Sequence, residues 1–170
     1  MSRLYLLRHA KAGWAEPGVR DFDRPLTEGG RRDAAAVGMA MRISGFVPDL
    51  VLCSTARRAR ETWECVAATI GHLPAPPVFT DSLYSCDAAG YLSIVRKTAG
   101  DMPSLLVVGH NPMIEDVAVA CAADGDDTEL TALASGFPTS ALAVIQFSLP
   151  LAEAAPGKGS LATFLTPAML

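Results

Sequence analysis

Short hydrophobic runs, bounded by polar or turn residues, recur along the chain and predict strands that are buried on both faces of a sheet. The clearest runs occupy residues 4–7, 49–53, 104–108, 141–149 and 161–165. Val78 and Phe79 follow a proline-rich turn and predict a further, short edge strand. We therefore expect a sheet that is covered on both sides by other parts of the chain.

Segments with a helical pattern lie between most of these runs, at residues 27–43, 57–70, 87–98 and 111–122. Thr27 stands where a helix N-cap is expected, and Glu28 follows in the first turn, where an acidic side chain favours the helix dipole. Ser54 and Thr55 are expected to cap the second helix. The acidic segment 124–129 is expected to be a surface loop.

Strand and helix thus alternate through the first two-thirds of the chain, which predicts a three-layer α/β/α sandwich around a mostly parallel central sheet. The last two strands are close in sequence, so we expect them to pair as an antiparallel hairpin at one edge. A length of 170 residues without internal repeats suits a single domain spanning residues 1–170.

Composition excludes several classes of protein. The net charge of −4 argues against a nucleic-acid binder, although a few local arginines can still hold a small anion. The apolar run at the N-terminus is too short for a signal peptide, and no run approaches the ~20 residues that a membrane span needs. The four cysteines lack the CxxC spacing of zinc or redox sites. We expect a soluble, cytoplasmic protein that has no contact with membranes.

Basic and histidine side chains follow three of the predicted strands. Arg8 and His9 follow the first strand, Arg57 and Arg58 begin the helix after the second, and His110 follows the third. Because ligands of open α/β sheets bind beyond the carboxyl ends of the strands, we expect these residues to converge on one rim. Only three histidines occur in the chain, and two of them follow predicted strands, which supports a functional site at this rim.

This set of residues points to phosphoryl transfer. The planar guanidinium of arginine matches phosphate oxygens, and helix N-termini add N–H donors. A neutral imidazole is a good nucleophile toward phosphorus, and a second histidine, if protonated, would stabilise the transferred charge. The expected reaction forms a phosphohistidine that water then hydrolyses. No metal site is implied, because two histidines among arginines repel a cation.

Three segments resemble, in the right order, the motifs of the histidine phosphatase superfamily, which has the phosphoglycerate mutase-like fold. They are LRHA at residues 7–10, STARRARET at 54–62 and GHNP at 109–112. Further segments resemble the small SixA-type phosphohistidine phosphatases: RHAKA at 8–12, DRPLT at 23–27 followed by Gly30, and PTSAL at 138–142. The resemblance covers nearly the whole chain.

The resemblance implies that His9 is the nucleophile, that Arg8 and Arg58 clamp the phosphoryl oxygens, and that His110 completes the phosphate pocket. It implies no cofactor. Arg57 and Arg60 are expected to point to solvent or to pair with acidic residues such as Glu61 or Glu64.

Departures from the wider superfamily affect the expected substrate. Ala10 replaces the motif glycine, and Ala12 and Ala15 replace a serine and an asparagine that follow it in sugar-phosphate enzymes. The segment between Arg58 and His110 is too short to cover a small substrate. These departures suit a phosphate displayed on another protein.

Segment 81–87 has no glutamate at the usual place of the general acid. Asp23 and Asp87 remain candidate proton donors, but the structural interpretation is favoured for both: Asp23 is expected to pair with a nearby arginine and Asp87 to cap a helix. Lys11 is expected either to steer phosphate or to be a solvated loop residue, and Trp14 to line or shield the rim of the site.

The leading hypothesis is therefore a metal-independent phosphatase that hydrolyses phosphohistidine on a phosphorylated protein domain. The alternative is a phosphatase for a small phosphate monoester, such as a sugar phosphate or a nucleotide. A non-catalytic phosphoprotein-binding module is less consistent with the residues, because such a module is expected to have lost His9 or one of the arginines.

Overall fold

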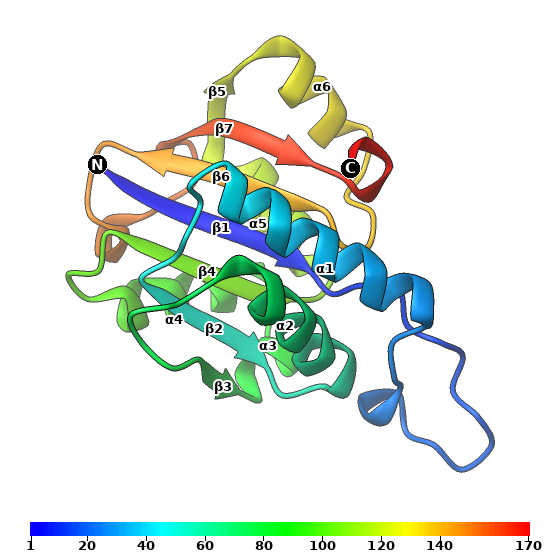
Figure 1. Ribbon diagram of the computed structural model, residues 1–170. Helices are drawn as coiled ribbons and strands as arrows, with labels where there is room; N and C mark the ends of the chain where they lie inside the picture. Colours follow the sequence, from blue (N-terminus) through cyan, green and yellow to red (C-terminus); the bar gives the residue numbers. More distant parts are fainter.

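The computed structural model describes residues 1–170 and contains a seven-stranded mixed sheet (Figure 1). Its strands lie in the order β3-β2-β4-β1-β6-β7-β5. Their bounds are β1 (Ser2–Arg8), β2 (Leu50–Ser54), β3 (Val78–Thr80), β4 (Ser104–Gly109), β5 (Ala122–Gly125), β6 (Leu142–Phe147) and β7 (Gly159–Leu165). The predicted fold class is confirmed, and β1 lies at the centre of the sheet.

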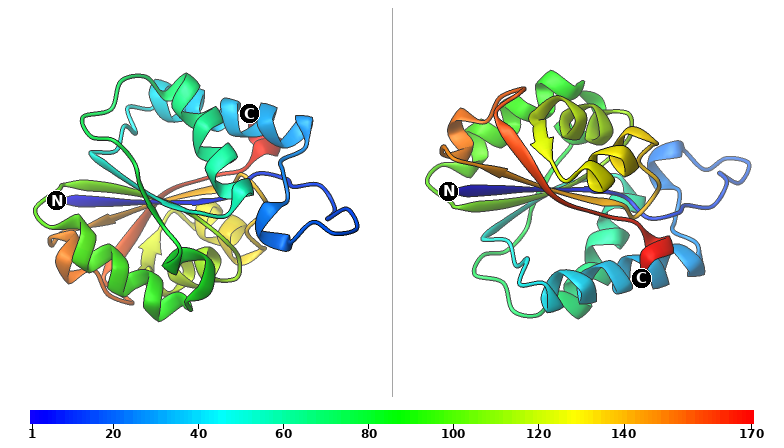
Figure 2. Two further views of the ribbon diagram at one scale, coloured as in Figure 1. Left: turned by 90° about the horizontal axis from the view of Figure 1, so that it is seen from below. Right: turned by 90° about the horizontal axis from the view of Figure 1, so that it is seen from above.

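Helices cover both faces of this sheet (Figure 2). They are α1 (Glu28–Ile43), α2 (Arg57–Ile70), α3 (Ser82–Ser85), α4 (Ala88–Ala99), α5 (Met113–Cys121) and α6 (Asp127–Ala134), with 3₁₀ turns η1 (Asp21–Asp23), η2 (Leu151–Glu153) and η3 (Pro167–Met169). None of the helices is long and apolar enough to cross a membrane.

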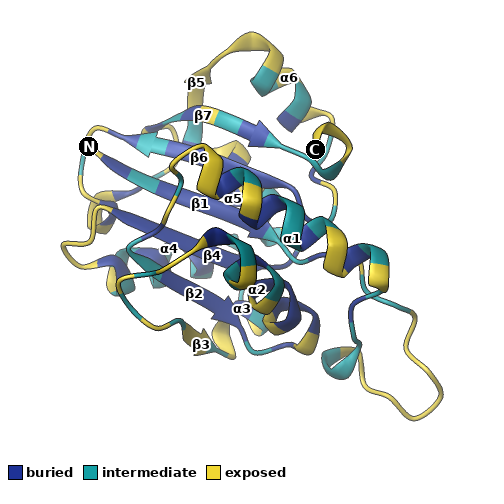
Figure 3. Cartoon of the chain, viewed as in Figure 1, coloured by how far each residue is buried: buried dark blue, intermediate teal, exposed yellow.

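Two hydrophobic clusters lie on opposite faces of the sheet. On β1, Tyr5 and Leu7 pack with residues of α1 and α2, whereas Leu4 and Leu6 pack with residues of the other four helices. Burial on both faces explains why the sequences of the central strands are nearly continuous hydrophobic runs, and Figure 3 shows β1, β2 and β4 largely as buried, whereas β3 and β5 at the two edges are mostly exposed.

The predicted antiparallel hairpin is confirmed but lies inside the sheet. β6 runs antiparallel to both β1 and β7, and β5 adds outside β7 in the parallel direction. The expectation of a surface loop at 124–129 was wrong, since this region holds the end of β5 and the start of α6. The acidic residues were misleading because Asp126 caps α6, its side chain accepting hydrogen bonds from the N–H groups of Thr128 and Glu129.

The N-termini of α1 and α2 lie close to the segment that follows β1. Thr27 is the N-cap of α1, as predicted, and its side chain accepts a hydrogen bond from Gly30 N–H. A Cβ atom at Gly30 would lie 2.3 Å from the Lys11 carbonyl oxygen, so glycine allows this close approach. The prediction that Ser54 and Thr55 cap α2 was wrong, because the N-cap is Ala56 and it has no side-chain cap.

Candidate active site

The pairing of β1 with β4 brings two histidines together. Arg8, the last residue of β1, pairs with Gly109 of β4, so His9 and His110 both follow directly after paired positions. The His9 N–H donates to the Gly109 carbonyl over 3.0 Å. The two imidazole centroids are 5.3 Å apart.

Arg58 reaches this pair from the first turn of α2. Its Nε–H donates to His9 Nε2 over 3.3 Å, and the side chain is largely buried. The neighbouring Arg57 is exposed and pairs with Glu61, as expected from the sequence. Arg60 is also exposed and donates to the Thr55 carbonyl. Arg58 is therefore the arginine of this segment that meets the histidines.

Hydrogen bonds fix the tautomer of His9. Its Nδ1 lies 2.7 Å from the Ala10 carbonyl oxygen, which can only accept, so Nδ1 carries the proton. The lone pair of Nε2 then accepts from Arg58. Burial, together with the positive charges of nearby arginines, Arg58 first, lowers the pKa of His9 to about 4 despite the opposing bond to Ala10. His9 is thus neutral at pH 7, with its free lone pair on Nε2.

His110 is also neutral and leaves one ring nitrogen without a partner. Its Nε2 lies 2.8 Å from the Ser54 hydroxyl, which accepts from the Ala56 N–H and can donate its own proton to the ring. In the tautomer in which Ser54 donates to Nε2, the ring proton is on Nδ1, which is buried and has no hydrogen-bond partner. Burial, with positive charge nearby, lowers the pKa of His110 to about 3. Hydrogen-bond donation by Nδ1–H therefore does not require the protonated ring that the sequence analysis considered.

Arg8 has a second unpartnered donor beside the histidines. Its Nη1 donates to the Phe137 carbonyl over 2.8 Å, but its Nε is buried without a partner. Burial lowers the pKa of this guanidinium. Buried N–H groups without partners are rare in folded proteins, and two of them near a nucleophilic nitrogen are typical of a site for an anion.

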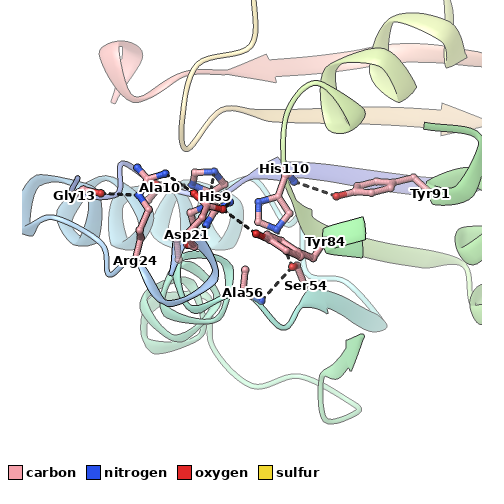
Figure 4. A network of polar contacts seen from close by, with 11 residues as sticks. His9, Ala10, Gly13, Asp21, Arg24, Ser54, Ala56, Tyr84, Tyr91 and His110 are labelled. Atoms are coloured by element: carbon pink, nitrogen blue, oxygen red, sulfur yellow. Dashed lines mark hydrogen bonds and ion pairs between the residues drawn. The ribbon is translucent and has the colours of Figure 1, made fainter. Parts of the chain in front are cut away.

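Two residues that the sequence analysis missed, Asp21 and Tyr84, complete the mouth of the site (Figure 4). Arg58 donates to the Asp21 carbonyl over 2.8 Å and to its carboxylate over 3.1 Å. The Tyr84 hydroxyl donates to the same carboxylate over 2.9 Å, and its ring lies edge-on to His110. Tyr84 lies in segment 81–87, where the sequence analysis considers only carboxylate side chains as candidates. Its aromatic ring and hydroxyl are the features that could have indicated it.

Buried hydroxyl groups hold the backbone on both sides of the site. Thr62 Oγ1 accepts from the Ala10 N–H over 2.8 Å and donates to the Arg58 carbonyl over 2.7 Å. The Tyr91 hydroxyl accepts from the His110 N–H and donates to the Leu83 carbonyl. These contacts link both histidines to the helices that cover the sheet.

The candidate proton donors have other partners. Asp23 forms an ion pair with Arg20 over 2.8 Å, and Asp87 caps α4 by accepting from the Gly90 N–H. Neither carboxylate hydrogen-bonds to His9 or His110, so their structural interpretations are confirmed. Lys11 and Trp14 are exposed on the segment that follows His9. No group of three or more His, Cys, Asp or Glu side chains is placed to hold a metal ion.

Comparison with known proteins shows the family to which this chain belongs. The sequence profile of the histidine phosphatase superfamily (branch 1) matches residues 4–90, which include His9 and Arg58. An uncharacterised protein of Mycobacterium tuberculosis is 34% identical over 163 residues, which cover 95% of this chain and 99% of that protein. The chain belongs to the histidine phosphatase superfamily.

Solved structures place this superfamily member among the SixA-like proteins. A candidate phosphohistidine phosphatase SixA from Agrobacterium tumefaciens is 37% identical, with a TM-score of 0.83 over 98% of this chain and 99% of that one. A second SixA candidate, from Nakamurella multipartita, is 31% identical, with a TM-score of 0.84 over 98% of this chain and 96% of that one. Membership and these neighbours together support a histidine-phosphatase type of function.

Proposed function

We propose that this protein hydrolyses phosphohistidine on a phosphorylated protein in the cytoplasm, through a covalent phosphohistidine on His9, and that the whole chain acts as one domain. The observation that carries the proposal is the neutral His9 ring, whose Nε2 lone pair lies beside Arg58. Arg8 Nε and His110 Nδ1 are buried without hydrogen-bond partners; Arg8 precedes His9 in the chain, and the His110 ring lies 5.3 Å from the His9 ring, centroid to centroid.

In the first step, the phosphoryl group binds among these donors. Arg8 Nε and His110 Nδ1–H gain an oxygen partner, and Arg58 exchanges its contact with His9 for a phosphoryl oxygen. Cationic and N–H donors that are already oriented stabilise the charge that spreads over the phosphoryl oxygens during transfer. Arg58 remains tethered through its bond to the Asp21 carbonyl, which holds the guanidinium in place.

Transfer then moves the phosphoryl group from the substrate ring to His9. The Nε2 lone pair forms a bond to phosphorus while the P–N bond of the substrate breaks, and that bonding pair returns to the substrate nitrogen. The Ala10 carbonyl accepts from Nδ1–H and so favours the more positive ring that results. Water next attacks phosphorus, the P–Nε2 bond breaks, and inorganic phosphate leaves with the oxygen of that water.

Phosphohistidine suits this site because its imidazole leaving group does not need a positioned acid on the enzyme to protonate it. When the second nitrogen of the substrate ring takes a proton from solvent, the ring leaves as neutral imidazole. An alkoxide from a phosphate monoester needs a positioned acid instead. Asp21 is the carboxylate at the mouth, and its ionic and hydrogen-bonding partners, Arg24, Tyr84 and Arg58, lower its pKa despite partial burial. An ionised Asp21 cannot supply that proton, which disfavours the alternative of a small phosphate monoester.

Hydrolysis rates for the purified protein test the proposal. We expect kcat/KM in EDTA to be higher for a histidine-phosphorylated protein domain than for any of a panel of sugar phosphates and nucleotides. His9→Ala should lower it by at least about a thousandfold and abolish radiolabelling of the enzyme by substrate phosphate. His72→Ala is the matched control, because His72 is exposed at the end of α2. Preference for one small ester, or full activity of His9→Ala, would overturn the proposal.

A further inference from the structure

Ser54 is the residue whose hydroxyl contacts the ring of His110. It is the last residue of β2, and it is completely buried. His110 follows β4, which pairs with β2 in parallel, so the two residues lie at the same end of neighbouring strands (Figure 4). Ser54 Oγ is 2.8 Å from His110 Nε2. A serine from one strand is thus placed on the histidine that follows the next.

The hydrogen-bonding capacity of Ser54 decides the direction of this bond. The Ala56 N–H lies 3.3 Å from Ser54 Oγ and can only donate, so one lone pair of the hydroxyl accepts from it. The hydroxyl has a single proton, and it has no contact with water because the residue is fully buried. His110 Nε2 is the acceptor that remains for this proton.

The two neutral tautomers of His110 differ in the number of buried polar groups without a partner. When Nε2 accepts from Ser54, one such group remains, the Nδ1–H of the ring. When Nε2 carries the proton instead, both the Nδ1 lone pair and the Ser54 hydroxyl proton lack a partner. Because each unpaired buried polar group costs free energy, the tautomer with its proton on Nδ1 is favoured.

Other contacts hold the His110 ring in place without Ser54. The Tyr91 hydroxyl accepts from the His110 N–H over 3.2 Å. The ring also packs against Tyr84 and His9, with centroids 5.5 and 5.3 Å away. Loss of the Ser54 hydroxyl should therefore change which ring nitrogen carries the proton, rather than move the ring.

We propose that Ser54 is a positioning residue, which donates to His110 Nε2 and thereby makes the neutral His110 ring a hydrogen-bond donor toward the phosphoryl group. This inference rests on the proposed function, in which His110 Nδ1–H binds a phosphoryl oxygen. With the proton on Nε2, the ring would instead turn a lone pair toward that oxygen and repel it. Burial, with positive charge nearby, lowers the pKa of His110 to about 3, so at pH 7 the tautomer, and not the charge, decides whether Nδ1 can donate.

Nitrogen NMR shifts of the His110 ring test the tautomer directly. We expect the wild-type protein at pH 7 to show a protonated Nδ1 and an unprotonated Nε2, and Ser54→Ala to shift the proton toward Nε2. The chain has three histidines, so the His110 signals are identified by their loss in His110→Gln.

Kinetics then test the consequence for the reaction. The substrates are a histidine-phosphorylated protein domain and phosphoramidate, a small molecule with the same P–N bond. Ser54→Ala should lower kcat for both by about tenfold to a hundredfold and change KM much less, because the hydrogen bond from Nδ1–H strengthens as charge develops on the phosphoryl oxygens.

Ser104→Ala is the matched control. Ser104 is also a buried serine, at the start of β4, and its hydroxyl contacts the N–H and the carboxylate of Asp49. We expect this variant to lose stability but to keep the wild-type tautomer and kcat. An equal fall of kcat in both variants would show a merely structural effect and overturn the inference.

Two further results would also overturn the inference: a His110 proton that stays on Nδ1 in Ser54→Ala, or a changed tautomer with an unchanged kcat. Preference of the wild-type protein for small phosphate esters would instead overturn the proposed function. The NMR shifts would still show whether Ser54 controls the tautomer, so the two failures are distinguishable.

Discussion

At the residue scale, the protonation state of His9 decides when the site can react. Its pKa, lowered to about 4 by burial and nearby arginines, leaves the ring neutral at pH values where an ordinary histidine is charged. If His9 is the nucleophile, as we propose, a ring that stays unprotonated in a positive pocket needs no separate base to activate it. The same burial makes the ring sensitive to acid in a way that can be measured.

We expect the C–H resonances of His9 and His110 to titrate well below pH 6.5 in NMR spectra of the free protein, with midpoints near 4 and 3. Because both folded pKa values are lowered, the two rings contribute stability that is complete above about pH 6.5. That contribution is lost as the pH falls toward the folded values. Urea unfolding should therefore give a lower free energy of unfolding at pH 5 than at pH 7. Midpoints near 6.5 would contradict the described burial.

Thr62 provides a second prediction at this scale. Thr62→Val keeps the shape of the side chain but leaves the buried Ala10 N–H without its acceptor. We expect a loss of about 1–3 kcal/mol in the free energy of unfolding, measured in urea, together with a lower kcat because Ala10 adjoins the nucleophile. Thr62→Ser, which keeps the hydroxyl, should retain most of both. Equal stability of the valine and serine variants would show that this hydrogen bond contributes little.

At the element scale, the 3₁₀ turn η1 closes one side of the proposed phosphate site through a single carboxylate. Asp21 accepts from Arg58, Arg24 and Tyr84, so it orders the turn while it occupies a donor that phosphate would use. Its negative charge also opposes the charge of an incoming phosphoryl group. The Asp21 carboxylate thus holds η1 in place, but it weakens the binding of a phosphoryl group at the proposed site.

We expect Asp21→Asn to strengthen binding of inorganic phosphate about fivefold, measured as its inhibition constant against phosphoramidate. The amide keeps an oxygen that can accept from the arginines but removes the repulsive charge. Asp124→Asn, at the far edge of the sheet in β5, is the charge-matched control and should change nothing. Weaker phosphate binding by Asp21→Asn would mean that holding Arg58 in place matters more than the repulsion.

The β5–α6 unit is the element that the hydrophobic pattern did not predict. Its strand is short and exposed, so it lacks the apolar run that marks β1, β2 and β4, and its acidic residues resemble those of a loop. Asp126 is in fact the N-cap of α6. Strands buried on both faces were predictable from sequence, whereas an edge strand held by backbone pairing to β7 was not.

We expect Asp126→Ala to lower the free energy of unfolding by about 1 kcal/mol, because two N–H groups of the first turn of α6 lose their acceptor. Asp127→Ala, which keeps the cap, should cost less. Neither change should alter kcat, since α6 contributes no residue to the site. A fall in kcat without a fall in stability would assign this acidic unit a function beyond capping.

At the scale of the whole molecule, the topology explains which part of the site was predictable. Arg8 ends β1, and His9 and His110 directly follow the buried parallel strands β1 and β4, so the strand pattern alone indicated that they would meet. Asp21 and Tyr84 meet through side chains that are 63 residues apart, on a loop and a one-turn helix without strong patterns. Only their three-dimensional packing reveals them, as it does the bond between Ser54 and His110.

The central place of β1 has a consequence for the synthesis of the chain. β1 leaves the ribosome before the six other strands of this sheet, and it finds its partners about a hundred residues later in β4 and about a hundred and forty residues later in β6. Until β4 and β6 have been made, β1 has no partner strand along either edge. Its apolar side chains are then exposed, so chaperones can bind them or the chain can aggregate. A nascent chain that stops before residue 142 cannot complete the sheet around β1. We therefore expect His9, the proposed nucleophile, to become active only after β6 has been made, although it is synthesised before Arg58 and His110.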